Sequence, residues 1–67
     1  MKISQNYIYM INKNLNSPKV YLLNCSNNFI YILEDDLYVE FICRMNSKEK
    51  NSQFDNIFND IGVFCDG

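Results

Sequence analysis

Histidine, tryptophan, alanine and threonine are absent from this 67-residue chain, which also contains only two glycines and one proline. The lack of histidine removes the commonest general base and the commonest metal ligand of proteins. Two glycines, Gly62 and Gly67, are too few for a glycine-rich loop that cradles phosphate. We therefore expect no catalytic residues, no cofactor and no bound metal ion, so that the protein is not an enzyme.

The length of the chain predicts one small domain, residues 1–67. A domain of this size buries only roughly 60% of its unfolded surface, which leaves little room for an enclosed substrate pocket. Hydrophobic residues make up 48% of the sequence and aromatic residues 15%. That apolar content favours a folded core over intrinsic disorder.

Positive charge is scarce, and the formal net charge is -2. A protein that binds nucleic acid through its phosphates is normally basic, so we expect no direct nucleic-acid partner. All eight acidic residues lie from Glu34 onward, and the densest group is Glu34, Asp35 and Asp36. These three residues predict either a solvated acidic turn or an acidic surface that attracts a basic partner.

The three cysteines, Cys25, Cys43 and Cys65, are odd in number, widely spaced and without a CxxC motif. This pattern fits neither a zinc site nor a disulfide framework, and it predicts buried free thiols in a reducing cytosol. A reactive thiol would need a neighbouring base, and the chain has no histidine to supply one.

Long hydrophobic runs are also missing, since the longest unbroken one, residues 29–33, is far shorter than a membrane span. The first residues resemble no signal peptide, because polar Ser4, Gln5 and Asn6 follow Met1 and Lys2. We expect a cytoplasmic protein without a membrane partner. Eleven asparagines suggest an A/T-rich genome, either bacterial or that of a phage acting in the host cytoplasm.

Two aromatic and β-branched runs, residues 7–11 and 19–23, surround an asparagine-rich segment that ends in Ser17 and Pro18. Such runs are typical of strands, and the segment between them is typical of a turn. The pattern predicts an antiparallel hairpin with a loop of about seven residues.

Residues 29–45 fit two periodicities. As strands, alternate residues from Leu37 to Met45 share one face; as a helix, Tyr38, Phe41, Ile42 and Met45 form a stripe that leaves Glu40, Arg44 and Ser47 outward. Propensity favours strands, whereas the polar spacing slightly favours helices. Periodicity leaves both structures open.

The last element is a helix with an apolar stripe formed by Phe54, Ile57, Phe58 and Ile61. Ser52 is the expected N-cap, Asp55 lies in the first turn, and Gly62 is the expected stop. The short apolar tail at residues 63–65 should pack back on the core.

Five tyrosines, an amphipathic residue type enriched at interfaces, lie within the first 38 residues. This number exceeds what so small a core needs, and we expect some of them to contact a partner. The five are Tyr7, Tyr9, Tyr21, Tyr31 and Tyr38.

The chain resembles PqqD-like domains, the leader-peptide recognition elements of ribosomal peptide biosynthesis. The resemblance covers residues 19–64: the strand-like run ending in Leu23-Asn24, residues 30–33, the apolar residues of 39–45, and the final stripe with Gly62-Val63. It implies three strands and three helices, and no catalytic activity. A peptide would then add as a strand at an edge formed by Val20, Tyr21 and Leu22, against a groove lined by Phe54 and Phe58.

Taken together, the sequence predicts an α+β fold: an N-terminal antiparallel β-hairpin or meander with a C-terminal amphipathic helix, winged-helix-like if residues 29–45 are helical. The function we expect is capture of a peptide or protein for a separate enzyme, with strand addition as one mode of binding. The alternative is a small phage or mobile-element inhibitor, similar to anti-CRISPR proteins, that occludes a host defence nuclease complex. A third kind of partner is a second copy of the chain, which would form a homodimer through a strand edge. The partner-binding candidates are Val20, Tyr21, Leu22, Tyr31, Phe54 and Phe58.

Overall fold

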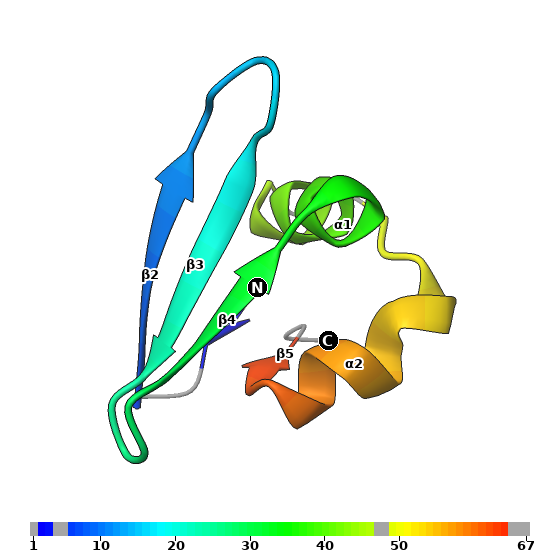
Figure 1. Ribbon diagram of the computed structural model, residues 1–67. Helices are drawn as coiled ribbons and strands as arrows, with labels where there is room; N and C mark the ends of the chain where they lie inside the picture. The colour runs from blue at the N-terminus through cyan, green and yellow to red at the C-terminus, as the bar shows by residue number, and fades with distance from the viewer. Residues whose placement is uncertain (1, 4–5, 47–48, 65–67) are drawn as a thin grey trace.

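A computed structural model describes residues 2–3, 6–46 and 49–64 of the chain. Its elements are β1 (Lys2–Ile3), β2 (Tyr7–Asn12), β3 (Lys19–Asn24), β4 (Phe29–Leu33), α1 (Asp35–Met45), a 3-10 turn η1 (Ser52–Phe54), α2 (Asp55–Asp60) and β5 (Val63–Phe64). Strands β2, β3 and β4 form an antiparallel sheet, and the helices cover one of its faces (Figure 1). The predicted α+β fold is therefore confirmed.

The sheet is a meander with β3 in its centre. Ile8 pairs with Leu23, and Leu23 pairs with Ile30, so the three strands run in continuous register. The predicted hairpin of β2 and β3 is confirmed, and asparagine side chains shape both turns of the meander. The Asn12 and Asn24 side-chain oxygens each accept a hydrogen bond from the backbone N–H two residues later. This local bonding is the property that makes asparagine a turn residue.

The ambiguous region, residues 29–45, divides into one strand and one helix. Residues 29–33 pair with β3 as the third strand, and the chain turns into α1 immediately after Glu34. The condition for a winged-helix arrangement, a helical 29–45, is therefore not met. Residues 29–33 form a strand because they pair with β3. Residues 35–45 form a helix whose Phe41 is buried against the sheet.

The core lies between the sheet and the two helices. It consists of one cluster of buried apolar side chains: Val20, Leu22, Leu33, Phe41, Phe58, Ile61 and Val63. Strands β3, β4 and β5 and both α-helical segments contribute to it, and β2 adds half-buried Tyr7 and Ile11 at its margin. The fold thus uses one face of the sheet and leaves the other face uncovered (Figure 1).

The C-terminal segment begins one residue earlier than predicted. Asn51, and not Ser52, is the N-cap of the 3-10 turn η1, because its side-chain oxygen accepts a hydrogen bond from the Gln53 N–H. The first turn is a 3-10 turn, and α2 then ends before Gly62, which has a φ of 86°. Of the predicted stripe, Phe58 and Ile61 are buried, Phe54 is half-buried and Ile57 is 42% exposed.

The tail after Gly62 returns to the domain as predicted. Val63 is buried, and β5 pairs antiparallel with β1, which brings the two ends of the described chain together. The predicted packing of Cys65 lies outside the described residues. No helix within the described ranges has the length and apolar character needed to cross a membrane.

Candidate functional site

The two faces of the three-stranded sheet are occupied differently, because side chains alternate between them. Val20 and Leu22 of the central strand point into the core, so their neighbours Tyr21 and Leu23 lie on the other side. We call this uncovered side the outer face. Cross-strand register assigns six apolar residues to it: Ile8, Met10, Tyr21, Leu23, Ile30 and Ile32.

The outer face is exposed to a degree that is unusual for apolar side chains. Ile8 and Met10 are each 62% exposed, Ile30 is 60% exposed, and Ile32 is 49% exposed. An antiparallel sheet with one covered face normally places polar residues on the side toward water. Here the rows Ile8–Leu23–Ile30 and Met10–Tyr21–Ile32 carry no polar residue apart from the Tyr21 hydroxyl.

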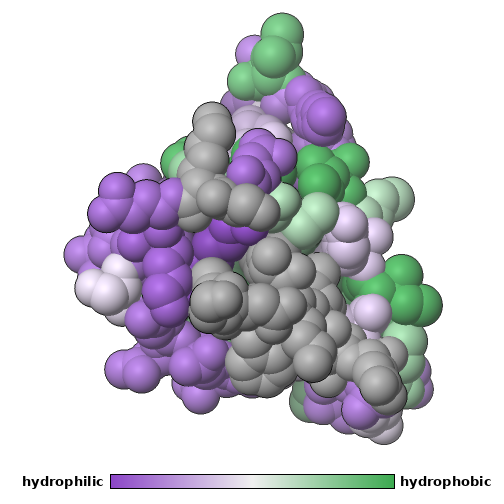
Figure 2. Space-filling view, turned by 180° about the vertical axis from the view of Figure 1, so that it is seen from behind, coloured by the Kyte–Doolittle hydropathy of each residue, from purple (hydrophilic) through white to green (hydrophobic). Residues whose placement is uncertain are grey.

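A shallow hollow of about 250 Å³ lies in this region. It is lined by Ile8, Tyr9, Met10, Tyr21, Leu23 and Ile30, none of which is charged. In the view from behind, hydrophobic residues gather on the side where the sheet lies, and hydrophilic residues dominate the side of the helices (Figure 2). A contiguous exposed apolar patch of this kind marks an interaction surface more often than ordinary surface.

The sheet also has two edges without a neighbouring strand in the described part of the chain. Strands β2 and β4 each pair only with β3. An open edge offers backbone N–H and C=O groups to an added strand. The outer face is therefore bordered on both sides by unpaired backbone.

The edge predicted at Val20, Tyr21 and Leu22 is wrong. These residues belong to β3, which is paired on both sides and has no free backbone edge. Val20 and Leu22 are moreover 0% exposed, and only Tyr21 of the three lies on the outer face. The sequence left residues 29–33 open between strand and helix, and their pairing as a third strand places β3 at the centre of the sheet and not at its edge.

The predicted groove of Phe54 and Phe58 is not formed either. Phe58 is fully buried in the core, and Phe54 is half-buried against it. Tyr31 lies on the core face of β4 with its ring centroid 6.3 Å from that of Tyr7. Both tyrosines pack against the core as half-buried residues, which leaves Tyr21 as the tyrosine of the outer face.

The residues that the sequence reasoning missed are those of the outer face other than Tyr21: Ile8, Met10, Leu23, Ile30 and Ile32. A signal for them was present, because all three strand sequences are apolar without a polar alternation. Such strands are typical of sheets buried on both faces. A chain this short can cover only one face with its own helices, so the other face stays open.

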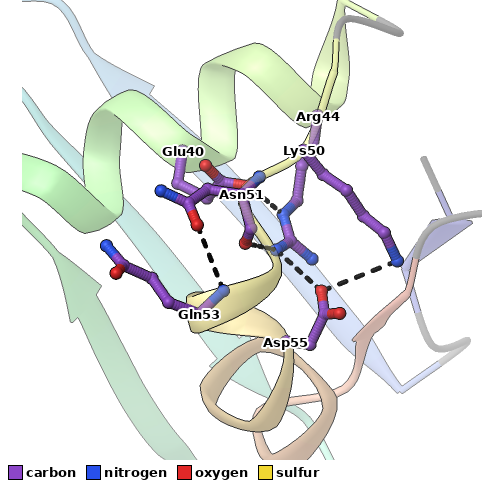
Figure 3. A network of polar contacts seen from close by, with 6 residues as sticks. All are labelled: Glu40, Arg44, Lys50, Asn51, Gln53 and Asp55. Carbon is purple, nitrogen blue, oxygen red and sulfur yellow. Dashed lines mark hydrogen bonds and ion pairs between the residues drawn. The ribbon is translucent and has the colours of Figure 1, made fainter.

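A second cluster, of polar side chains, lies between α1 and the segment before α2 (Figure 3). The Arg44 Nε donates to Glu40 Oε2 over 2.6 Å, and the Arg44 Nη2 lies 3.1 Å from Asp55 Oδ1. Glu40 is 6% exposed and Arg44 is 3% exposed. The prediction that both point outward is therefore wrong; Ser47, predicted with them, lies outside the described residues.

This cluster joins α1 to the segment that leads into α2. The Arg44 Nη2 also donates to the Asn51 carbonyl oxygen, and the Asn51 backbone N–H donates to Glu40 Oε2 over 3.0 Å. Lys50 Nζ lies 3.6 Å from Asp55 Oδ1 at the exposed margin. Among the described residues, every buried side-chain nitrogen and oxygen has a hydrogen-bond partner. The cluster thus holds the connection into α2, and its buried polar atoms are engaged within the domain.

The acidic surface predicted at Glu34, Asp35 and Asp36 lies at the beginning of α1, not in a free turn. All three residues are exposed, and Glu34 is the N-cap residue without a side-chain cap bond. Acidic residues in a first turn interact favourably with the helix dipole. This placement gives the three residues a structural role that needs no partner.

Groups that could bind a metal or act as nucleophiles are dispersed. In the described ranges, no three His, Cys, Asp or Glu side chains gather closely enough to hold a metal ion. Cys25 is exposed and Cys43 is partly exposed, contrary to the prediction that these thiols are buried.

No family model matches the chain, and neither a curated protein nor a solved structure is significantly similar to it.

Proposed function

We propose that this domain is a non-enzymatic protein-binding module whose contact surface is the outer face of the sheet. One observation supports this function best: six apolar side chains from three strands form an uncharged surface that the domain's own helices do not cover. Burial of such a surface against another protein is favourable by roughly 25 cal/mol per Å² of apolar area. Leaving it in water gives no benefit to a chain with so small a core.

Peptide capture by strand addition is a second candidate, and the open edges of β2 and β4 favour it. The peptide would pair beside one of these edges and extend the outer face by a fourth strand. In this version the peptide pairs with β2 or β4, and not with residues 19–23 as the sequence predicted. Delivery of the captured peptide to a separate enzyme, and inhibition of a nuclease complex, are narrower forms of the same protein-binding function.

Site-specific photo-crosslinking in the native host tests the proposed function. Benzoylphenylalanine at position 30 places the crosslinker on the outer face, and the same group at position 39 places it on exposed α1. Val39 is a suitable control, because it is apolar and 57% exposed, close to the 60% of Ile30. We expect a discrete crosslinked protein from position 30 and none from position 39. No product from position 30, or equal products from both, would count against the proposal.

A further inference from the structure

The chemistry of the outer face restricts what can cover it. Its occupant must present an apolar, uncharged surface, because a charge placed against Ile8, Met10, Ile30 or Ile32 would lose its water without gaining a partner. Sheets pack face to face about 10 Å apart with strands within about 30° of each other. The outer face of a second copy of this chain has the required size, shape and chemistry.

We infer that the partner of the outer face is a second copy of this chain, so that two sheets form a sandwich about a two-fold axis. The inference rests on the proposed function and names the partner. An isologous interface needs a self-complementary patch, and an uncharged apolar face satisfies this without matching donors to acceptors. The hollow of about 250 Å³ gives one sheet a recess for side chains that protrude from the other.

The distribution of charge is compatible with this arrangement. All acidic residues lie at position 34 or later, and those in the helices are on the opposite side of the sheet from the outer face. Two copies therefore keep most of their negative charge apart. By register, the polar pair Asn12 and Lys19 lies on the same side of the sheet just beyond the apolar rows, so the only charge near the uncharged patch in the described strands is at one end of it. Antiparallel strands in the two copies place the two Lys19 residues at opposite ends, where they do not repel each other.

The available area predicts a dimer of moderate strength. Four side chains between 49% and 62% exposed, with Tyr21 and Leu23 between them, give a patch on the order of 500 Å², toward the upper part of the range for the largest patch on a monomer. Two such patches bury roughly 1,000 Å², which is about the lower limit for a specific interface. We expect dissociation constants in the micromolar range, not the nanomolar range.

Sedimentation equilibrium of the purified chain with reductant, at about 1 to 200 µM, tests the inference. Reductant excludes a disulfide through exposed Cys25. We expect the mass to rise from 8.0 kDa toward twice that value. Met10→Lys should weaken the dimer at least about tenfold, because it buries a charge in the interface. Val39→Lys, an equivalent change on α1, should leave it unchanged, and circular dichroism should show both variants folded.

Three outcomes separate this inference from the proposed function. A wild-type chain that stays monomeric at the highest concentration overturns the inference. If position 30 then crosslinks to a different protein, the binding function still stands; if it crosslinks to nothing, both fail. A dimer that persists in folded Met10→Lys also overturns the inference, since its interface would then lie elsewhere, such as at a strand edge. A crosslinked product of twice the chain mass supports it.

Discussion

The guanidinium carbon of Arg44 lies 4.3 Å from the centroid of the Phe58 ring. This contact joins α1 to α2 through the core, and the same guanidinium also bonds Glu40 and Asp55. The Phe58 ring is thus buried beneath a charged group that donates hydrogen bonds to two carboxylates and to the Asn51 carbonyl oxygen. Arg44 serves as both a packing residue and an ion-pair partner.

Removal of Arg44 alone should be much more harmful than removal of the whole ion pair. Arg44→Met leaves the Glu40 carboxylate buried without its partner, and breaking a buried pair in this way costs about 3–5 kcal/mol. That is comparable to the total stability expected of so small a domain. Glu40→Leu combined with Arg44→Met should cost less than Arg44→Met alone. Urea unfolding of Arg44→Met, Glu40→Leu and the double variant measures the coupling; a loss in the double variant equal to the sum of the two single losses would show that the pair is not coupled.

Gly62 is constrained twice, by its backbone and by Tyr7. Its φ is 86°, and a Cβ at this position would overlap the Tyr7 ring. We expect Gly62→Ala to lower the free energy of unfolding by about 1–3 kcal/mol. Thermal unfolding in a Tyr7→Ala background separates the causes, because the overlap is then relieved and only the backbone strain remains. A Gly62→Ala cost that is the same in both backgrounds would eliminate the contact with Tyr7 as a cause.

The free energy of unfolding should fall in alkaline solution because the Tyr7 hydroxyl ionises. Burial, followed by the neighbouring Tyr31, raises the pKa of the Tyr7 hydroxyl above its ordinary value, while a hydrogen bond from Asn24 opposes the shift. The folded state therefore favours the protonated hydroxyl. The contribution of the Tyr7 hydroxyl to the free energy of unfolding is complete below the pKa of about 10 that it has in the unfolded chain, and it is lost as the pH rises through the pKa of the folded state.

The urea midpoint measured from about pH 8 to pH 11.5 checks this sign for Tyr7. Tyr7→Phe has no hydroxyl to ionise, so its midpoint should decline less steeply over the same interval, even if it starts lower through loss of the Asn24 bond. Parallel declines in the two proteins would assign the alkaline sensitivity to other groups.

Proline should be tolerated in the hairpin loop and not in the central strand. Val20→Pro removes a backbone donor from β3, which is bonded on both sides, and we expect a loss of about 3 kcal/mol or more with extensive unfolding. Leu15 is 97% exposed and follows Asn14, whose carbonyl oxygen accepts from the Ser17 N–H in a tight turn. That is the position where proline is favoured, so Leu15→Pro should fold normally. Circular dichroism of both variants distinguishes the two; a folded Val20→Pro would contradict the central position of β3.

Local features were readable from the sequence because local chemistry decides them. The asparagine-rich segment before Pro18 places the turn of the first hairpin, and Gly62 marks the stop of the last helix. Aromatic and β-branched runs predict strands β2 and β3. These features need no information from distant parts of the chain.

Only the tertiary structure decided which strand is central, which face is covered and which charges are buried. Residues 29–33 become a strand by pairing with β3, and that pairing makes β3 the central strand. Packing of the helices on one face of the sheet then buries Val20 and Leu22. Glu40 and Arg44 look like surface residues by periodicity, yet the segment around Asn51 covers them. The outer face is uncovered because two short helices can pack on one side of the sheet but not on both. Which side they cover depends on contacts between segments that are distant in the sequence.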